Sequence, residues 1–370
     1  MRRKQGILGP AGSGGPRRTG QMGRRPRLPE KVTALLFKGG GGMRRLLFVS
    51  LAAVLASWFP TGCRERVSET TPPSETAVPG SAPTQMRTFE VGRSTREFDL
   101  EGATELTIDN RFGDVEVGAG GPRVRVESVV YARGADLADA RTRAAGLAIE
   151  GGPDPEAGFT IAVRHDAGTS EIRADLVVAA PSHVGLKVRV GSGDVRASAL
   201  TGNAEVRASS GDLRVEDVAG SVSAETTSGD VRVSGVGGDA TVRCGSGSAA
   251  VAGVEGPALV RTLSGDITLR DVRGDAITTS TGSGEIDIRL SLPWAGNLEA
   301  RSNSGRITVA LSPNSNCRVR TATGSGDIAS ELPLTDVSRQ GRNISGRLGR
   351  GEGLVDVATG SGDIRLLPAK

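Results

Sequence analysis

Apolar and polar residues alternate with a period of two in short runs across residues 191–368. Such alternation is typical of a β-strand with one buried face. Each run follows a glycine, and the second and fourth residues after that glycine are small and apolar. The pairs are Val195/Ala197, Leu213/Val215, Val231/Val233, Ala249/Val251 and Ile267/Leu269. The pattern predicts many short strands that share one narrow core.

The runs recur every 18 residues, and a second glycine series lies nine residues after the first. The first series is Gly193, Gly211, Gly229, Gly247 and Gly265, followed at looser steps by Gly284, Gly305, Gly326, Gly346 and Gly362. The second series is Gly202, Gly220, Gly238, Gly256 and Gly274. Each coil therefore consists of two nine-residue halves, each with a bend and a strand. This predicts an all-β parallel β-solenoid with coils of about 18–21 residues.

Stacked coils place like residues above one another at the ~4.8 Å spacing of paired strands. Small side chains suffice to fill the gap between two facing sheets. A three-sided coil with six-residue faces is the alternative, but counting six residues from Val195 reaches Thr201 and Arg207. Its buried positions would hold charges, so the two-sided coil is favoured.

Residues 87–190 contain less regular alternating runs and one alanine-rich stretch, residues 136–147, that predicts a helix. We expect this segment to be the irregular N-terminal part of the solenoid body. The helix is a candidate cap, because solenoids need atypical ends that cover open strand edges.

The first 86 residues resemble processing and tether segments. Residues 1–42 are basic and lack apolar periodicity, and Met43 opens MRRLLFVSLAAVLASWFPTGC. We expect residues 1–42 to lie upstream of the true start and residues 43–62 to be a signal peptide. A long basic n-region is the alternative. Residues 63–86 are polar and rich in Pro, Ser and Thr, which predicts a disordered linker.

Cys63 follows Thr61 and Gly62, which suit the end of a bacterial lipobox, although Pro60 replaces the usual aliphatic residue. We expect Cys63 to carry a lipid that attaches the protein to a membrane. Ordinary signal cleavage is the alternative. Cys244 and Cys317 lie about four coils apart by this register, too far for a disulfide.

The net charge of +4 comes from the leader. Residues 64–370 hold 34 basic and 41 acidic residues, a net of −7, so nucleic acid is not an expected partner. The 54 glycines, single tyrosine and two histidines fit a turn-rich fold with a small-residue core.

The Ser-Gly-Asp turns are the candidate sites of chemistry. Their glycines and acids are Gly193, Asp194, Gly211, Asp212, Gly229, Asp230, Gly265, Asp266, Gly326, Asp327, Gly362 and Asp363. A calcium β-roll would need a Gly-Gly-x-Gly-x-Asp motif in every half, which is absent. We predict instead that Gly permits the bend, that Asp binds local backbone donors, and that Asp and Arg columns offset each other's charge.

Two stretches carry a family resemblance. Residues Ala174 to Ala197, ADLVVAAPSHVGLKVRVGSGDVRA, and Ile344 to Leu366, ISGRLGRGEGLVDVATGSGDIRL, resemble the entry and the ending of the bacterial putative-adhesin domain family. This is a domain of unknown function with Ser-Gly-Asp repeats, found in envelope proteins and lipoproteins. The resemblance implies a β-helix-like fold outside the cytoplasm, and no catalytic residues.

We therefore expect a non-enzymatic protein of the cell envelope, an adhesin or surface-binding lipoprotein without catalytic residues, metal or cofactor. Its expected partners are the membrane, through Cys63, and an envelope protein or a surface glycan. An accessory protein that binds another envelope protein is the alternative. A polysaccharide-active enzyme is less favoured, because Tyr131 and Trp294 are the only aromatic residues with polar groups in the body.

Overall fold

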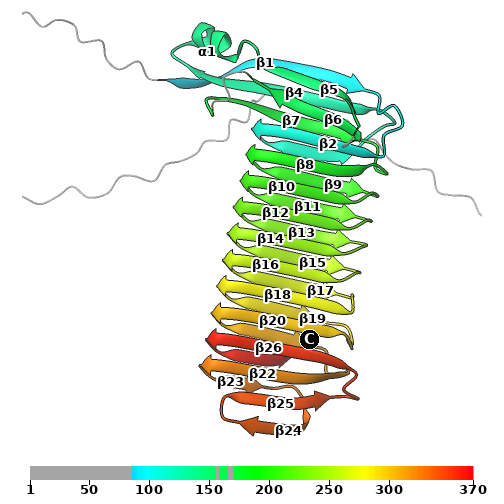
Figure 1. Cartoon of the computed structure of the whole chain (residues 1–370), viewed down its shortest axis with the longest axis vertical. Coiled ribbons are helices and arrows are strands. Elements are labelled where there is room, and N and C mark those ends of the chain that lie inside the picture. Colours follow the sequence, from blue (N-terminus) through cyan, green and yellow to red (C-terminus); the bar gives the residue numbers. More distant parts are fainter. Residues whose placement is uncertain (1–85, 156–157, 166–169, 370) are drawn as a thin grey trace, which may run out of the picture. The chain divides into compact units, whose positions relative to one another are not determined.

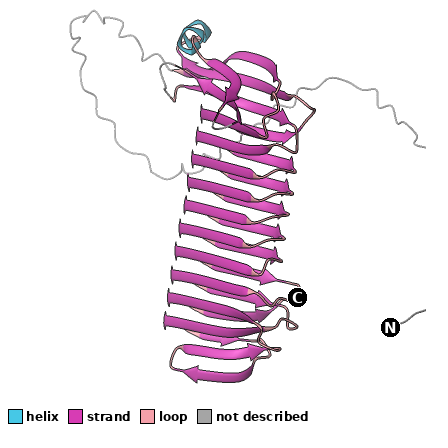
Figure 2. Ribbon diagram, turned by 45° about the vertical axis from the view of Figure 1, so that its right-hand side comes forward, coloured by secondary structure: helices cyan, strands magenta, loops and turns pink. Residues whose placement is uncertain are grey.

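The computed structural model describes residues 86–155, 158–165 and 170–369. These residues form one elongated stack of 27 strands in two sheets, with a single helix at one end (Figures 1 and 2). Within them, no helix has the length and hydropathy needed to cross a membrane. The leader, the signal peptide, Cys63 and residues 63–85 of the expected linker lie outside the described residues.

Sheet A has 13 strands. In spatial order they are β1 (Arg87–Phe98), β4 (Val124–Gly134), β7 (Ile172–Ala180), β3 (Val115–Ala119), β9 (Val195–Leu200), β11 (Leu213–Val218), β13 (Val231–Val236), β15 (Ala249–Val254), β17 (Ile267–Val272), β19 (Ile286–Leu290), β21 (Ile307–Leu311), β27 (Ile364–Pro368) and β23 (Ile328–Ser330).

Sheet B has 14 strands and faces sheet A across the core. In spatial order they are β24 (Thr335–Gln340), β25 (Asn343–Leu348), β22 (Cys317–Ser325), β26 (Gly353–Ser361), β20 (Asn297–Ser304), β18 (Ala276–Ser283), β16 (Ala258–Ser264), β14 (Ala240–Ser246), β12 (Val222–Ser228), β10 (Ala204–Ser210), β8 (Gly185–Ser192), β2 (Glu105–Phe112), β6 (Gly158–Arg164) and β5 (Ala148–Asp154).

The regular coils run from β8 to β17 and confirm the predicted parallel β-solenoid. Each strand from β8 to β15 pairs in parallel with the strand 18 residues later, for example Ala204 with Val222 and Leu213 with Val231. The residues predicted to point inward are buried, and they form one continuous apolar cluster along the stack. Two nine-residue halves per coil therefore describe this part of the chain.

At the N-terminal end, spatial order departs from sequence order. The coil β2–β3 lies beneath β8–β9, about 80 residues further along the chain. Beyond it, β7 joins β3 in parallel, and β4 and β1 continue sheet A with antiparallel pairing. The predicted helix is α1 (Leu137–Ala144), capped by Asp136, whose carboxylate accepts the Asp139 backbone N–H. Ala140 of α1 packs with Ala132 and Ile172.

At the C-terminal end, the last coil in sequence is not the last coil in space. Strands β26 and β27 lie between β20–β21 on one side and β22–β23 on the other. The antiparallel strands β25 and β24 then complete sheet B (Figure 1). The prediction that Gly346 is a turn glycine is wrong, because Gly346 lies inside β25, opposite Val319 of β22.

The inserted coil also changes the predicted distance between two cysteines. Cys244 of β14 and Cys317 of β22 are five strands apart in sheet B rather than four. Both are buried and free. Burial raises the pKa of the Cys317 thiol to about 11 and raises the pKa of the Cys244 thiol as well.

Candidate binding face

The Ser-Gly-Asp turns stack into a column along one edge of the solenoid. Gly211 has a φ of +134°, and a Cβ there would lie 2.0 Å from the carbonyl oxygen of Gly193 in the preceding coil. Only glycine satisfies both conditions. The same close approach recurs along the whole column, which consists in spatial order of Gly113, Gly193, Gly211, Gly229, Gly247, Gly265, Gly284, Gly305, Gly362 and Gly326.

Six of the aspartates that follow a turn glycine accept a backbone hydrogen bond from the adjacent coil. The backbone amides of the turn glycine and of the second residue after it donate hydrogen bonds within the sheet ladder. The amide of the residue between these two donates instead to the aspartate carboxylate of the neighbouring coil. The pairs, each with the N–H donor first, are Asp194 to Asp114 at 2.9 Å, Asp212 to Asp194 at 2.9 Å, Asp230 to Asp212 at 2.8 Å, Ser248 to Asp230 at 2.9 Å, Glu285 to Asp266 at 2.8 Å and Asp327 to Asp363 at 3.1 Å. The aspartates are thus structural caps between coils.

The predicted neutralisation of the aspartates by the arginines two residues later is largely wrong. Among these described pairs, only Asp230 and Arg232 approach, at 3.8 Å. Arg214 instead binds Glu216 at 2.7 Å, and this hydrogen bond lowers the pKa of Glu216. One oxygen of the aspartate already accepts a hydrogen bond from a backbone amide. Glu216, two residues after Arg214, lies on the same face of the strand and is therefore the nearer partner of the arginine.

Inside the turn column lies a second column of hydroxyl and thiol side chains that the sequence prediction missed. Thr281 donates to the Gly265 carbonyl at 3.0 Å, Thr359 to Gly305 at 3.0 Å and Thr323 to Gly362 at 2.9 Å. Cys244 occupies the same position, with its thiol 3.2 Å from the Gly229 oxygen. A sequence pattern could have revealed this column. The third inward residue of the sheet B strand in these coils is Ala, Thr, Cys or Ser.

No group of three or more His, Cys, Asp or Glu residues in the described part of the chain gathers into a cation site. The aspartates that follow the turn glycines, here called the aspartate column, place at most one carboxylate on each coil. One oxygen of each accepting aspartate receives a hydrogen bond from a backbone amide. A shared cage of oxygen ligands, which calcium requires, is not formed by these turns.

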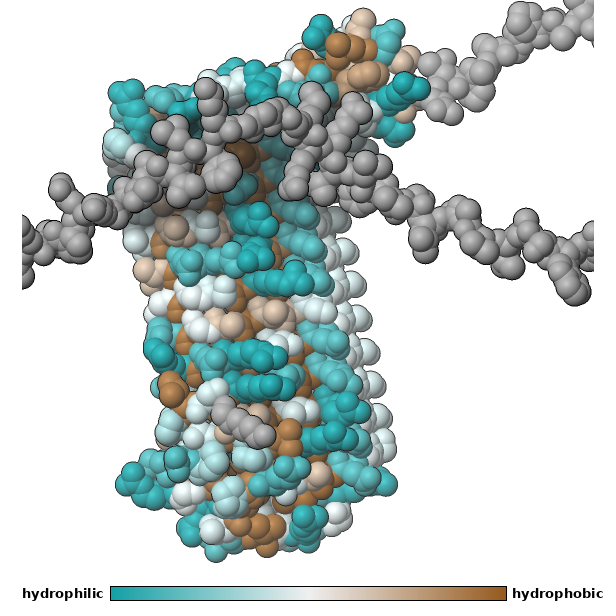
Figure 3. Space-filling view, turned by 180° about the vertical axis from the view of Figure 1, so that it is seen from behind, coloured by the Kyte–Doolittle hydropathy of each residue, from teal (hydrophilic) through white to brown (hydrophobic). Residues whose placement is uncertain are grey.

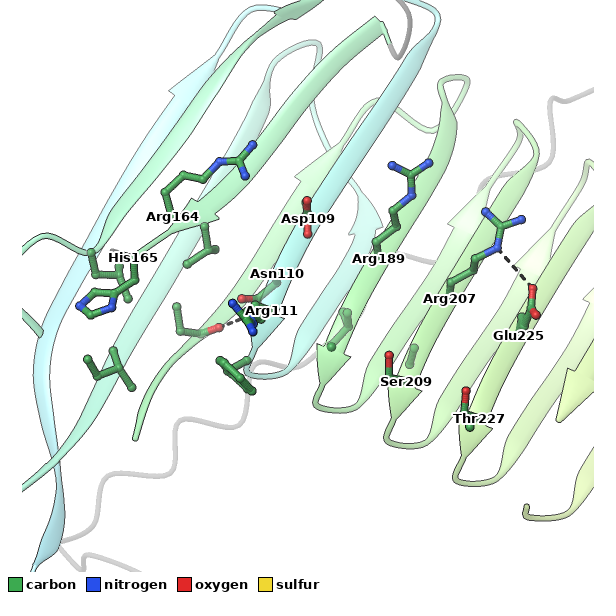
Figure 4. A pocket seen from close by; sticks show the side chains of 18 residues that line it. Asp109, Asn110, Arg111, Arg164, His165, Arg189, Arg207, Ser209, Glu225 and Thr227 are labelled. Atoms are coloured by element: carbon green, nitrogen blue, oxygen red, sulfur yellow. Dashed lines mark hydrogen bonds and ion pairs between the residues drawn. The ribbon is translucent and has the colours of Figure 1, made fainter. Parts of the chain in front are cut away.

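A groove of about 620 Å³ lies across the ends of several sheet B strands near the N-terminal end (Figure 4). Its polar lining includes Asp109, Arg111, Arg164, Arg189 and Arg207. Figure 4 shows that these side chains come from β2, β6, β8 and β10. Four arginines and two acids, Asp109 and Glu225, thus surround one hollow.

One wall of the groove is apolar, and one buried polar atom faces into the same region. Leu147, Val163 and Ile172 form the apolar wall. Asn110 donates through Nδ2 to the carbonyl oxygens of Ala174 at 2.8 Å and Gly113 at 3.2 Å, while its Oδ1 accepts no hydrogen bond.

From the groove, a line of arginines continues along the outward face of sheet B. We call it the arginine column, and it consists of Arg189, Arg207, Arg243, Arg261 and Arg301. Strand register aligns these positions: Arg189 pairs with Arg207, and Arg243 pairs with Arg261. Glu225 and Ser280 occupy the intervening positions of the same column.

Two members of the arginine column are paired with acids. Arg207 contacts Glu205 and lies 3.3 Å from Glu225. Arg301 contacts Glu299 and lies 3.1 Å from Asp356. Within the described residues, Arg189, Arg243 and Arg261 have neither an ion pair nor a side-chain hydrogen bond, and all three are exposed.

The two sheet faces differ in charge over the seven coils that begin with β8–β9. On sheet B the outward side chains include six bases and three acids, a net of +3: Lys187, Arg189, Arg207, Arg243, Arg261 and Arg301 against Glu205, Glu225 and Glu299. On sheet A they include five bases and four acids: Arg196, Arg214, Arg232, Arg270 and Arg289 against Glu216, Asp217, Asp271 and Asp287. The aspartate column adds further negative charge beside sheet A, where it lines a second groove with Arg196 and Arg214.

Both faces are flat and repetitive, and they carry polar side chains rather than a large apolar patch. In Figure 3 hydrophilic side chains alternate with paler and brown ones down one long side of the stack. Guanidinium groups in register, free of internal partners, are suited to hold carboxylate or phosphate groups through charge-assisted hydrogen bonds.

The fold and this face define the class of the protein: a two-sided parallel β-solenoid with one coil per Ser-Gly-Asp turn. The chain belongs to the Toastrack DUF4097 family, whose model matches residues 166–255 and 237–367, more than half of the chain. The resemblance seen in the sequence is thereby confirmed. No curated protein matches the chain.

Three solved structures are similar to the chain, and each match covers 75% of this chain. A putative cell adhesion protein from Clostridium sporogenes has 9% identity and a TM-score of 0.27 over 99% of its length. Putative adhesins from Bacteroides fragilis and Parabacteroides distasonis have 11% and 10% identity and TM-scores of 0.32 and 0.34, each over 97% of its length.

Proposed function

We propose that this chain is an exported, non-enzymatic binding protein of the cell envelope, an adhesin or surface-binding lipoprotein that presents its sheet faces to a partner. The observation that carries the proposal is the in-register repetition of outward side chains along sheet B. A partner that follows such a face meets the same chemistry once per coil, so weak contacts add over several coils.

Attachment to the envelope rests on the sequence. Residues 43–62 fit a signal peptide, Cys63 fits the lipid-bearing residue, and residues 63–86 fit a polar tether. A Cys63→Ala variant is expected to leave the membrane fraction for the soluble fraction when expressed in a bacterial host. Retention of this variant in the membrane to the level of the unchanged protein would contradict the lipid anchor.

An accessory role, in which the protein binds another envelope protein, is the second candidate. The observation in its favour is β24, whose six residues are all exposed and which pairs on one side only, with β25, in the described structure. An open strand edge of this kind can accept a strand from a partner.

A pull-down with the protein from residue 64 separates these roles. This form of the protein retains the whole described solenoid, and it is mixed with solubilised envelope fractions, intact cells and isolated surface glycans. Retention on cells or glycans supports the surface-binding role, whereas recovery of one stoichiometric protein supports the accessory role. Recovery of none of these would overturn the proposal.

A further inference from the structure

We infer that the arginine column of sheet B binds an acidic glycan, a sugar polymer that carries carboxylate groups, laid along the solenoid axis. This inference rests on the proposed function and names the class of its partner. It is carried by the free arginines, by the hydroxyl groups beside them and by the charge difference between the two faces.

In the strand register, Arg189 lies beside Asp109 and Arg243 beside Glu225, whereas Arg261 has no acidic neighbour. Arg243 and Arg261 are direct neighbours in the parallel register of β14 and β16, at the ~4.8 Å strand spacing. Like charges directly opposite one another destabilise a sheet. A carboxylate held between the two guanidinium groups would remove that repulsion and form charge-assisted hydrogen bonds to both.

Hydroxyl-bearing and small residues border much of the arginine column on both sides, whereas Leu259 and the exposed Leu263 flank Arg261. In the column nearer the strand starts, Ser223, Thr241 and Thr278 face outward. In the column nearer the turns, Ser209 and Thr227 lie beside glycines. A shallow floor with hydroxyl groups next to a line of cations matches a chain of sugars whose acid groups recur between neutral hydroxyl groups.

The density of charge favours a glycan over a nucleic acid. A net of +3 over seven coils is low, and Glu205, Glu225 and Glu299 interrupt the bases. Double-stranded DNA carries one charge per ~1.7 Å and would meet these carboxylates repeatedly. A polymer with one carboxylate per sugar carries fewer charges per unit length and meets the glutamates less often.

Aromatic stacking contributes little to this recognition. Trp294 is buried, and its indole N–H donates to the Gly274 carbonyl at 2.9 Å. Binding therefore depends on charge and hydrogen bonds, which makes each contact weak and salt-sensitive. Affinity should rise with the length of the polymer, because a longer chain spans more coils.

The test uses the protein from residue 64 and polygalacturonate as the probe, with neutral dextran for comparison. We expect polygalacturonate to bind, to bind more weakly at about 200 mM than at about 50 mM salt, and to bind better as its length increases. Dextran should not bind. Absence of polygalacturonate binding, or equal binding of dextran, would overturn the inference.

A pair of double variants locates the site. Arg243→Ser with Arg261→Ser should lower the affinity for polygalacturonate about tenfold or more, because two charge-assisted contacts are lost. Serine suits this position, since Ser280 occupies it two coils after Arg243. Arg196→Ser with Arg214→Ser, on sheet A, is the matched control and should change the affinity less than about twofold. The reverse ranking would contradict the assignment.

Poly-glutamate tests whether the ligand is a sugar. It carries carboxylates without sugar hydroxyl groups and should bind at least about tenfold more weakly than polygalacturonate of similar length. Equal binding would refute the sugar-specific part of the inference. If the Arg243→Ser and Arg261→Ser double variant keeps its affinity for polygalacturonate, and the protein binds cells, the proposed function stands and this inference fails.

Discussion

The regular middle of the solenoid and its two ends use the same building unit in different ways. From β8 to β17, each coil lies on the coil before it in sequence, and one 18-residue rule gives every pairing. At the ends, the coil β2–β3 lies under a coil about 80 residues later, and the last coil, β26–β27, is inserted between two earlier ones.

The difference shows that a Ser-Gly-Asp turn fixes how coils stack but not which coils are neighbours. A Cβ on Gly326 would lie 2.2 Å from the Gly362 carbonyl oxygen, close to the 2.0 Å between a Cβ on Gly211 and the Gly193 oxygen. Antiparallel strands then close each end of the stack, β4 and β1 at one end and β25 and β24 at the other.

Removal of the inserted coil should disrupt the end of the stack. If the chain stops at residue 352, β22 loses its parallel neighbour β26, so residues 317–348 can no longer rest on the solenoid. We expect amide hydrogen exchange in residues 317–348 to accelerate on the order of 100-fold, while residues 185–272 keep their protection. Unchanged protection of residues 317–348 would show that these strands rest on β20–β21 instead.

A methyl group added to a glycine of the turn column should lower the free energy of unfolding more than one added to a glycine of an end turn. Gly211→Ala places a Cβ against the Gly193 backbone, and we expect a loss of roughly 3 kcal/mol in the free energy of unfolding. Gly341→Ala, at the turn between β24 and β25, has a φ of +59° and no atom within 4 Å, so about 1 kcal/mol is expected. Equal losses in denaturant titrations would refute the column's steric role.

The buried thiol near the C-terminal end should make stability sensitive to high pH. Burial raises the pKa of Cys317 from about 9 to about 11, so the folded state holds the proton more tightly than the unfolded state. This stabilisation is complete below pH ~9 and is lost as the pH rises towards 11, by up to roughly 2 kcal/mol.

Denaturant titrations between pH 8 and pH 11 measure this loss. Cys317→Ala should lose less stability over that interval than the unchanged protein. Cys244→Ala, in the regular middle, provides the comparison, because the Cys244 thiol contacts two carbonyl oxygens. The same pH slope for Cys317→Ala and the unchanged protein would contradict the prediction.

The aspartate caps should make a smaller contribution. Asp212→Ala removes the acceptor for the Asp230 amide, and we expect a loss of about 1 kcal/mol in unfolding free energy. Asp212→Asn keeps an oxygen acceptor and should cost less than half of that. If the two variants lose the same amount in thermal or denaturant unfolding, the carboxylate acts through its charge and not as a cap.

The smallest effect is expected at a bend that the sequence prediction did not find. Ala199, Asp217, Gly235, Gly253 and Asp271 occupy equivalent positions and all have positive φ. Ala199, with a φ of +59°, is the strained member. Ala199→Gly should therefore raise the unfolding free energy by about 0.5–1 kcal/mol, whereas Ala197→Gly, in a buried strand, should lower it. A loss of stability in Ala199→Gly would contradict the strain.

The fold of the middle was predictable because its cause is local. The 18-residue glycine period and the alternating apolar residues determine strand, bend and buried face in every coil from β8 to β17. The insertion of β26 was not predictable, since all turns carry the same motif and the choice among neighbours depends on long-range packing. Gly346 was misassigned for the same reason: it continued the glycine spacing but belongs to an antiparallel strand.

The sequence revealed less of the candidate face. Arginines recur in it, but only the strand register shows that Arg243 and Arg261 are neighbours and that Arg207 and Arg301 are paired with acids. The groove could not be foreseen, because it combines β2, β6 and β8, which are far apart in sequence. The hydroxyl column was visible as a sequence pattern, but its acceptors are carbonyl groups of turns that only the fold brings near.

The most direct measurement of the central claim is arginine-specific chemical footprinting with phenylglyoxal, read by mass spectrometry, with and without polygalacturonate. We predict that the polymer protects Arg189, Arg243 and Arg261 on sheet B, and that Arg196 and Arg232 on sheet A stay reactive. Equal protection of both sheets, or protection of sheet A alone, would contradict the assignment of the sheet B arginine column as the binding face.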